Sequence, residues 1–112
     1  MKTGQFIQQG DVIIKKVNIS LSGMKNLSGM KKIKKQARGF VLAEGEATGH
    51  AHTTIDDIEM FEKYGIMYIG AKEKFTVTHE EHKPVVVEKG VYEIGIVQEY
   101  DHFAEEARNV AD

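Results

Sequence analysis

The chain contains no cysteine, no tryptophan and a single proline among its 112 residues. Without thiols it can form neither a disulfide nor a thiolate metal site, and a cysteine nucleophile is excluded. Any metal ion must therefore be bound by histidine, aspartate or glutamate side chains. The absence of cysteine fits a reducing compartment, and we expect a cytoplasmic protein.

Long apolar runs are also absent. No segment approaches the roughly 20 apolar residues of a membrane-spanning helix, so we expect no association with a membrane. The N-terminal stretch MKTGQFIQQGD lacks the apolar core of a secretory signal. There is no GxSxG nucleophile elbow, P-loop or GxGxxG fingerprint, so nothing supports serine hydrolysis or nucleotide binding by those routes.

Short β-type runs separated by glycine-containing turns dominate what is present. The length predicts one domain over residues 1–112. The pattern predicts an all-β fold, a small sandwich or barrel of short antiparallel strands, with a short C-terminal helix or tail at 103–112. We expect strands at 12–19, within 39–55, and at 65–71, 74–79 and 85–100, the last range being two strands around a turn at 88–90. Residues 56–64 could form a short helix, but a hairpin with its turn at 63–65 fits the returning strand better.

Alternation along these strands selects the residues that should face the core. The candidate core positions are Val12, Ile14, Val41, Ile66, Tyr68, Phe75, Val77, Val86, Tyr92, Ile94 and Ile96.

Charge is distributed unevenly along the chain. Residues 1–42 carry nine Lys/Arg and one acid, whereas residues 43–112 carry six Lys/Arg and sixteen acids. Residues 20–38 are expected to be a long, flexible basic loop, in which Lys31, Lys32, Lys34 and Lys35 could contact phosphates. A basic run is more often a solvated loop, this one has no interleaved aromatic residue, and the acidic remainder would repel a polyanion. Nucleic acid is therefore not the partner that the sequence favours.

Four of the five histidines occur in two tight pairs, HAH at 50–52 and HEEH at 79–82. His50 and His52 would project from the same face of a strand. If His79 and His82 lie beside them, the four imidazoles could bind one divalent metal ion, of which zinc is the best candidate. Glu46, Glu80 or Glu81 could then act as the general base for a metal-bound water.

A plainer interpretation of the histidines must be kept beside this one. Surface histidines are often bystanders, and each pair alone is a weak signal. Together, in a short chain without cysteine, the two pairs indicate a polar site more strongly than they indicate catalysis. A cupin-like geometry stays open, although the second cupin motif is absent and Glu59 comes too late after HAH for the first one.

The order of the motifs resembles that of a family of small uncharacterised proteins from bacteriophages and bacterial genomes. The motifs are QGDV (9–12), LAEGEATGHAH (42–52), HEEHKP (79–84), GVYEI (90–94) and QEYDHF (98–103). The resemblance implies that the four paired histidines belong to the family pattern together with Glu44, Glu46, Tyr92, Gln98 and Tyr100. His102 departs from it, because the family has proline at that position, and the basic segment 20–38 lies outside it.

Three hypotheses follow. The first is a histidine-rich, metal-binding β-protein encoded by a phage or prophage, whose activity would be metal-assisted hydrolysis. The second is a non-catalytic structural or interaction module, such as a virion component or a host-factor binder, that self-associates or captures a protein in the host cytoplasm or in the virion. The third is nucleic-acid binding through the basic segment.

Overall fold

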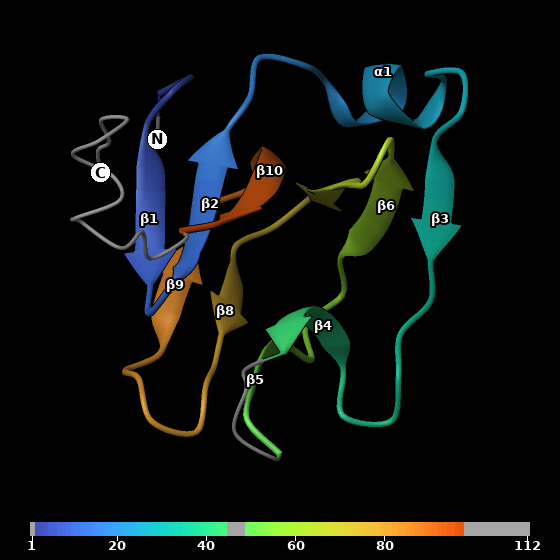
Figure 1. Ribbon diagram of the computed structural model, residues 1–112. Coiled ribbons are helices and arrows are strands. Elements are labelled where there is room, and N and C mark those ends of the chain that lie inside the picture. The colour runs from blue at the N-terminus through green and yellow to red at the C-terminus, as the bar shows by residue number, and fades with distance from the viewer. Residues whose placement is uncertain (1, 45–48, 98–112) are drawn as a thin grey trace, which may run out of the picture.

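The computed structural model describes residues 2–44 and 49–97. Glu46, Gln98, Tyr100, His102 and the expected tail 103–112 lie outside the described residues. The fold is all-β with antiparallel strands, as the sequence predicts (Figure 1).

A six-stranded antiparallel sheet forms the larger part of the fold (Figure 1). Its strand order is β1-β2-β10-β7-β6-β3, so the C-terminal strand β10 lies between an N-terminal strand and a central one. The strands are β1 (Phe6–Gln9), β2 (Val12–Lys16), β3 (Lys31–Ile33), β6 (Glu59–Lys63), β7 (Ile66–Ala71) and β10 (Gly90–Ile96).

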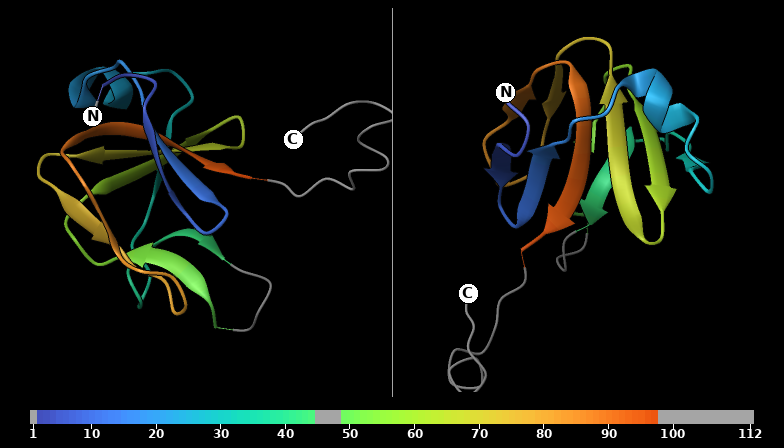
Figure 2. Two further views of the ribbon diagram at one scale, coloured as in Figure 1. Left: turned by 90° about the vertical axis from the view of Figure 1, so that its left-hand side faces the viewer. Right: turned by 90° about the horizontal axis from the view of Figure 1, so that it is seen from above.

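Two small sheets complete the fold. β4 (Phe40–Glu44) pairs with β5 (Ala51–Thr54), and β8 (Phe75–Val77) pairs with β9 (Val85–Val87). An isolated bridge between Thr53 and Thr78 connects the two small sheets. Figure 2 shows them facing the large sheet, and the main core cluster contains residues from all three.

The basic segment 20–38 is more structured than the sequence analysis expects. It contains the short helix α1 (Leu21–Lys25) and the edge strand β3, which corrects the expectation of one long loop. Ser20 caps the helix by accepting a hydrogen bond from the Gly23 N–H. The helix packs on β7 at Gly70, where an added Cβ would overlap the Leu21 side chain. In the described ranges no helix is long and apolar enough to cross a membrane.

Two tight turns connect neighbouring strands of the large sheet. The hairpin between β6 and β7 turns at Tyr64 and Gly65, which both have positive φ as a type I′ turn requires, and this confirms the predicted position. The β1–β2 hairpin turns at Gly10 and Asp11, with a φ of 59° at Gly10. That second turn carries the polar triplet 9–11 into the site described below.

Six of the eleven expected core residues are buried, and five are not. The five misplaced residues are Val41, Ile66, Tyr68, Val86 and Ile96. Val41, Ile66, Tyr68 and Val86 lie on strands that bury the alternate set instead: Phe40 and Leu42, Ile69 and Ala71, and Val87. A strand whose two faces are both apolar does not reveal which face is inward, and a one-residue error exchanges all its side chains. Ile96 lies at the end of β10, where the strand leaves the core.

Candidate metal centre

The four paired histidines meet at one end of the fold. His50 precedes β5, His52 lies in it, His79 follows β8 and His82 lies in the β8–β9 loop. The ring centroids of His52 and His79 are 4.3 Å apart, those of His79 and His82 are 4.6 Å apart, and those of His50 and His79 are 5.7 Å apart. In Figure 2 (left) the β1–β2 turn, β5 and the β8–β9 loop gather at the same end.

The bridge between the two small sheets brings the histidine pairs together. Thr53 and Thr78 exchange both backbone hydrogen bonds, at 3.0 and 2.8 Å. His52 and His79 each come next to a bridged residue on the antiparallel partner, so they are cross-strand neighbours. The expected juxtaposition of HAH and HEEH therefore has a backbone cause.

The four imidazoles differ in how far they are exposed to solvent. His52 is only 2% exposed, His50 and His79 are half-buried, and His82 is exposed. Burial, followed by the charge of the neighbouring His79, lowers the pKa of His52, against an opposing effect of Asp11. The neutral imidazole, which is the form that binds metals, is thus favoured at His52.

Gln9 fixes the orientation of the buried imidazole. Its Nε2 donates to the carbonyls of Val77 and Lys83, at 3.0 and 2.8 Å. Its Oε1 must therefore be an acceptor, and it lies 2.8 Å from His52 Nδ1. The neutral His52 ring then carries its proton on Nδ1, which leaves a lone pair on Nε2.

That lone pair faces a carboxylate. His52 Nε2 lies 3.4 Å from Asp11 Oδ1. Two acceptors that face each other at this distance are stabilised only by a proton or another cation between them. Asp11 is exposed, so this contact lies between the buried His52 imidazole and the solvent.

Gly10 is needed at the same place for two reasons. Its φ of 59° suits glycine, and a Cβ there would lie 2.6 Å from His82 Nε2 and 3.3 Å from His52 Cε1. The turn backbone therefore packs directly against two of the imidazoles.

Residues 8–97 match a protein family described as Domain of unknown function (DUF8820). The chain belongs to the DUF8820 family. No curated protein and no solved structure matches the chain. The phage or prophage origin that the motif resemblance implies stays a prediction.

The DUF8820 match contains all four paired histidines and the triplet Gln9-Gly10-Asp11. It ends before Gln98, Tyr100 and His102. The triplet is not evident from the sequence as part of the site, although QGDV is among the ordered motifs. A polar triplet at a hairpin turn was the available signal, but no local pattern shows which long-range partners such a turn meets.

Two of the three candidate bases are described, and they have different contacts. Glu80 accepts a 2.8 Å hydrogen bond from the Ala51 N–H, and this bond lowers the pKa of Glu80, so it ties two segments together. Glu81 is exposed, and its Oε2 lies 3.5 Å from His50 Nδ1. Glu46 lies outside the described residues, which leaves Glu81 as the described candidate best placed for proton transfer.

His79 has the opposite orientation to His52. Its Nδ1 accepts a 3.0 Å hydrogen bond from the Glu81 N–H, so the neutral ring carries its proton on Nε2. Within residues 2–44 and 49–97, no group of three or more His, Cys, Asp or Glu side chains is arranged so that it could hold a metal ion with the side chains as they stand.

Two further residues of the resemblance lie away from the cluster. Glu44 is exposed and its Oε2 lies 3.2 Å from Arg38 Nη2. Tyr92 is fully buried in the core, where its hydroxyl donates to the Glu88 carbonyl, and burial raises the pKa of Tyr92. Both therefore have structural explanations.

Proposed function

We propose that this DUF8820 chain binds a divalent transition-metal ion, with zinc as the best candidate, through His50, His52, His79 and His82. The observation that carries the proposal is the buried Nε2 lone pair of His52, held by Gln9 and facing Asp11 across 3.4 Å. A metal ion would replace the unfavourable contact between two acceptors with two favourable ones. Asp11 is thereby an additional candidate ligand.

The spacing of the imidazoles is compatible with this role. Two imidazoles bound to one zinc ion at about 2.1 Å through each nitrogen have ring centroids about 5 Å apart. Four of the six pairs of rings have centroid separations of 4.3 to 6.0 Å. Small rotations of side chains, rather than movement of the backbone, would bring the nitrogens toward a common point.

One specific rearrangement follows from the proposal. For Nε2 of His79 to bind metal, the Glu81 N–H must release Nδ1 and the proton must move to that nitrogen. His82 is exposed and His79 is half-buried, so the β8–β9 side of the cluster has room for such a change. Metal binding should therefore be accompanied by a local change around residues 79–82.

Metal-assisted hydrolysis is the activity proposed for the site. The exposed side of the cluster could admit water, and a metal ion lowers the pKa of water bound to it. Glu81 would accept the proton, because Glu80 is engaged with the Ala51 N–H. An E81Q variant that keeps metal affinity but loses turnover of chromogenic phosphate and carboxylate esters would support this activity.

A second, non-catalytic function is favoured by the anchoring bonds. Gln9 joins β1 to the β8–β9 side of the fold, and Glu80 joins that side to β5. A metal ion at their meeting point would lock three segments, as structural metal sites do in small domains. Such a lock would serve an interaction module as well as an enzyme.

The experiment that tests metal binding compares wild type with His52→Asn, both purified without a histidine tag. The asparagine amide keeps a donor for Gln9 Oε1 but has no counterpart of the Nε2 lone pair. We expect zinc affinity, measured by competition with a chromogenic chelator, to fall by more than about 100-fold, the upper range for loss of a supporting partner. Gln36→Ala is the control, at an exposed glutamine whose side chain makes no hydrogen bond among the described residues. Equal zinc affinity in His52→Asn and wild type would contradict the proposal.

A further inference from the structure

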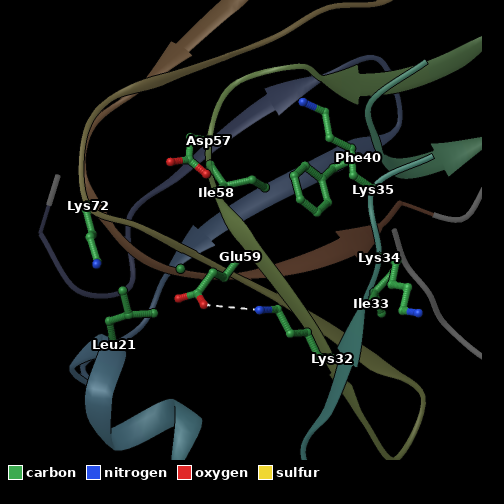
Figure 3. A pocket seen from close by; sticks show the side chains of 11 residues that line it. Leu21, Lys32, Ile33, Lys34, Lys35, Phe40, Asp57, Ile58, Glu59 and Lys72 are labelled. Atoms are coloured by element: carbon green, nitrogen blue, oxygen red, sulfur yellow. Dashed lines mark ion pairs between the residues drawn. The ribbon is translucent and has the colours of Figure 1, made fainter. Parts of the chain in front are cut away.

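A lysine-lined groove lies apart from the histidine cluster. It consists of two adjoining hollows with volumes of about 440 and 430 Å³ that share Leu21 and Lys72 in their walls. Figure 3 shows the first hollow, with Phe40, Ile33 and Ile58 in its walls and lysines around it. We call the two hollows together the lysine groove.

The lysines of the groove come from many parts of the chain. They are Lys16, Lys32, Lys34, Lys35, Lys72 and Lys89. Three of them belong to the basic run that the sequence reveals, and three come from β2, from the turn after β7 and from the residue before β10. Lys31, also in the basic run, does not line either hollow.

One of the two acids in the walls of the groove, Glu59, is already neutralised. Glu59 Oε1 lies 2.9 Å from Lys25 Nζ, and Glu59 Oε2 lies 3.5 Å from Lys32 Nζ. In Figure 3 the Lys32 amine points toward this carboxylate. Asp57 is the other acid in the wall and opposes anion binding.

Three lysines retain unneutralised charge. Among the residues that the structure describes, no ion pair joins Lys34, Lys72 or Lys89 to a carboxylate. All three side chains are exposed. They stand at both hollows, and Lys72 belongs to the wall that the hollows share.

The net charge of the described residues bears on anion binding. The described residues carry fourteen Lys/Arg and eleven Asp/Glu, a net charge of +3. The excess of acids that makes the whole chain −2 lies in residues 45–48 and 98–112. The part of the chain that builds the groove is thus basic.

We propose that the lysine groove binds single-stranded nucleic acid through its phosphates, without reading the base sequence. A strand carries charges at regular intervals, which matches lysines distributed along two hollows better than a compact anion would. Lysine is a flexible point charge, suited to phosphates but not to fixed base recognition. Phe40 is 9% exposed and offers little stacking surface, so binding should be weak and strongly salt-dependent.

The test measures the fluorescence anisotropy of a labelled oligothymidylate with the full chain at low and at physiological salt. The triple variant Lys34→Gln/Lys72→Gln/Lys89→Gln removes the three unpaired lysines. The matched control, Lys2→Gln/Lys31→Gln/Lys63→Gln, removes the same charge from lysines that line neither hollow. We expect at least tenfold weaker binding in the groove variant, a salt slope smaller by about 2, and little change in the control.

Each other outcome counts against the proposal. Equal weakening in the two triple variants would show that only net charge matters. Absence of binding by the wild type at low salt would also overturn it. If inorganic triphosphate displaces the oligonucleotide at an equal concentration of phosphate groups, the ligand class is a small polyanion and the nucleic-acid assignment is wrong. Zinc affinity of the same samples reports the histidine cluster separately, so failure here leaves the metal proposal standing.

Discussion

The histidine cluster and the lysine groove are built in opposite ways from similar sequence signals. Both signals are short runs rich in one residue type. His52, His79 and His82 have ring centroids 4.3 to 6.0 Å apart, and His50 lies 5.7 Å from His79, because the Thr53–Thr78 bridge brings the two histidine pairs together. The lysines of the basic run divide between the groove and the surface beside it. Clustering in sequence therefore becomes a compact site only where long-range pairing brings the clusters together.

The two regions also differ in how their side chains are held. His52 is buried and oriented by Gln9, which is itself bound to two carbonyls. Lys34, Lys72 and Lys89 are exposed and have no ion pair among the described residues. The cluster should accordingly be selective for its ligand and sensitive to single substitutions, whereas the groove should be unselective and respond to the sum of its charges.

The largest effect is expected when the anchor of the cluster is removed. Gln9→Ala leaves the carbonyls of Val77 and Lys83, of which the first is buried, and His52 Nδ1 without their partner. We expect a loss of about 2–3 kcal/mol in the free energy of unfolding and a loss of roughly 10–100-fold in zinc affinity. Urea denaturation and chelator competition measure the two quantities. Gln36→Ala, at an exposed glutamine whose side chain makes no hydrogen bond among the described residues, is the control, and an equal effect of both substitutions would contradict the anchoring role.

The next effect should come from adding one methyl group at the turn. Gly10→Ala places a Cβ 2.6 Å from His82 Nε2, whereas at Gly4 a Cβ has nothing within 4 Å. Both glycines have positive φ, so each alanine should reduce stability by about 1–2 kcal/mol through backbone strain. Only Gly10→Ala should also weaken zinc binding. Equal zinc affinity in the two variants would show that the turn does not position the cluster.

Each variant can also be tested with the ligand of the other region. We expect His52→Asn to leave oligonucleotide binding unchanged and the groove triple variant to leave zinc affinity within about twofold of wild type, because the sites share no residue. Titrations of both ligands on both variants provide the measurement. If each variant also lost affinity for the ligand of the other region, the two regions would be coupled through the fold.

The smallest effect concerns the ion pair beside the groove. The hydrogen bond from Lys25 lowers the pKa of Glu59 below its usual 4.5. The resulting stabilisation is present at pH above 4.5 and disappears as pH falls through the lowered pKa. Glu59→Gln should therefore be less stable than wild type at neutral pH, by under about 1 kcal/mol for so exposed a pair, and equally stable in acid. Urea denaturation at several pH values would show this, and a constant difference at all pH values would contradict it.

Local rules predicted the parts of the fold that depend on neighbouring residues. The strand pattern and the Tyr64-Gly65 turn follow from alternation and from the φ values that glycine permits. The inward faces of β7 and β9 could not be predicted, since their residues are apolar on both sides. They are settled by packing across the sheets, which a linear pattern does not contain.

The candidate site was predicted only as far as its histidines. HAH and HEEH identified the four imidazoles, but Gln9, Gly10 and Asp11 reach them from about 40 residues earlier in the sequence. Nothing in the local sequence shows that Glu80 binds a backbone N–H while Glu81 stays exposed. Likewise, Lys16, Lys72 and Lys89 join the basic run only through the strand order of the large sheet.

The most direct test of the central claim, that the four paired histidines form one metal site, is a zinc titration followed by the side-chain ¹⁵N NMR signals of the histidines. If they do, the signals of His50, His52, His79 and His82 should change together and stop changing at one equivalent of zinc. His52 should also carry its proton on Nδ1 before zinc is added. Signals that change independently, or only well beyond one equivalent, would contradict a shared site.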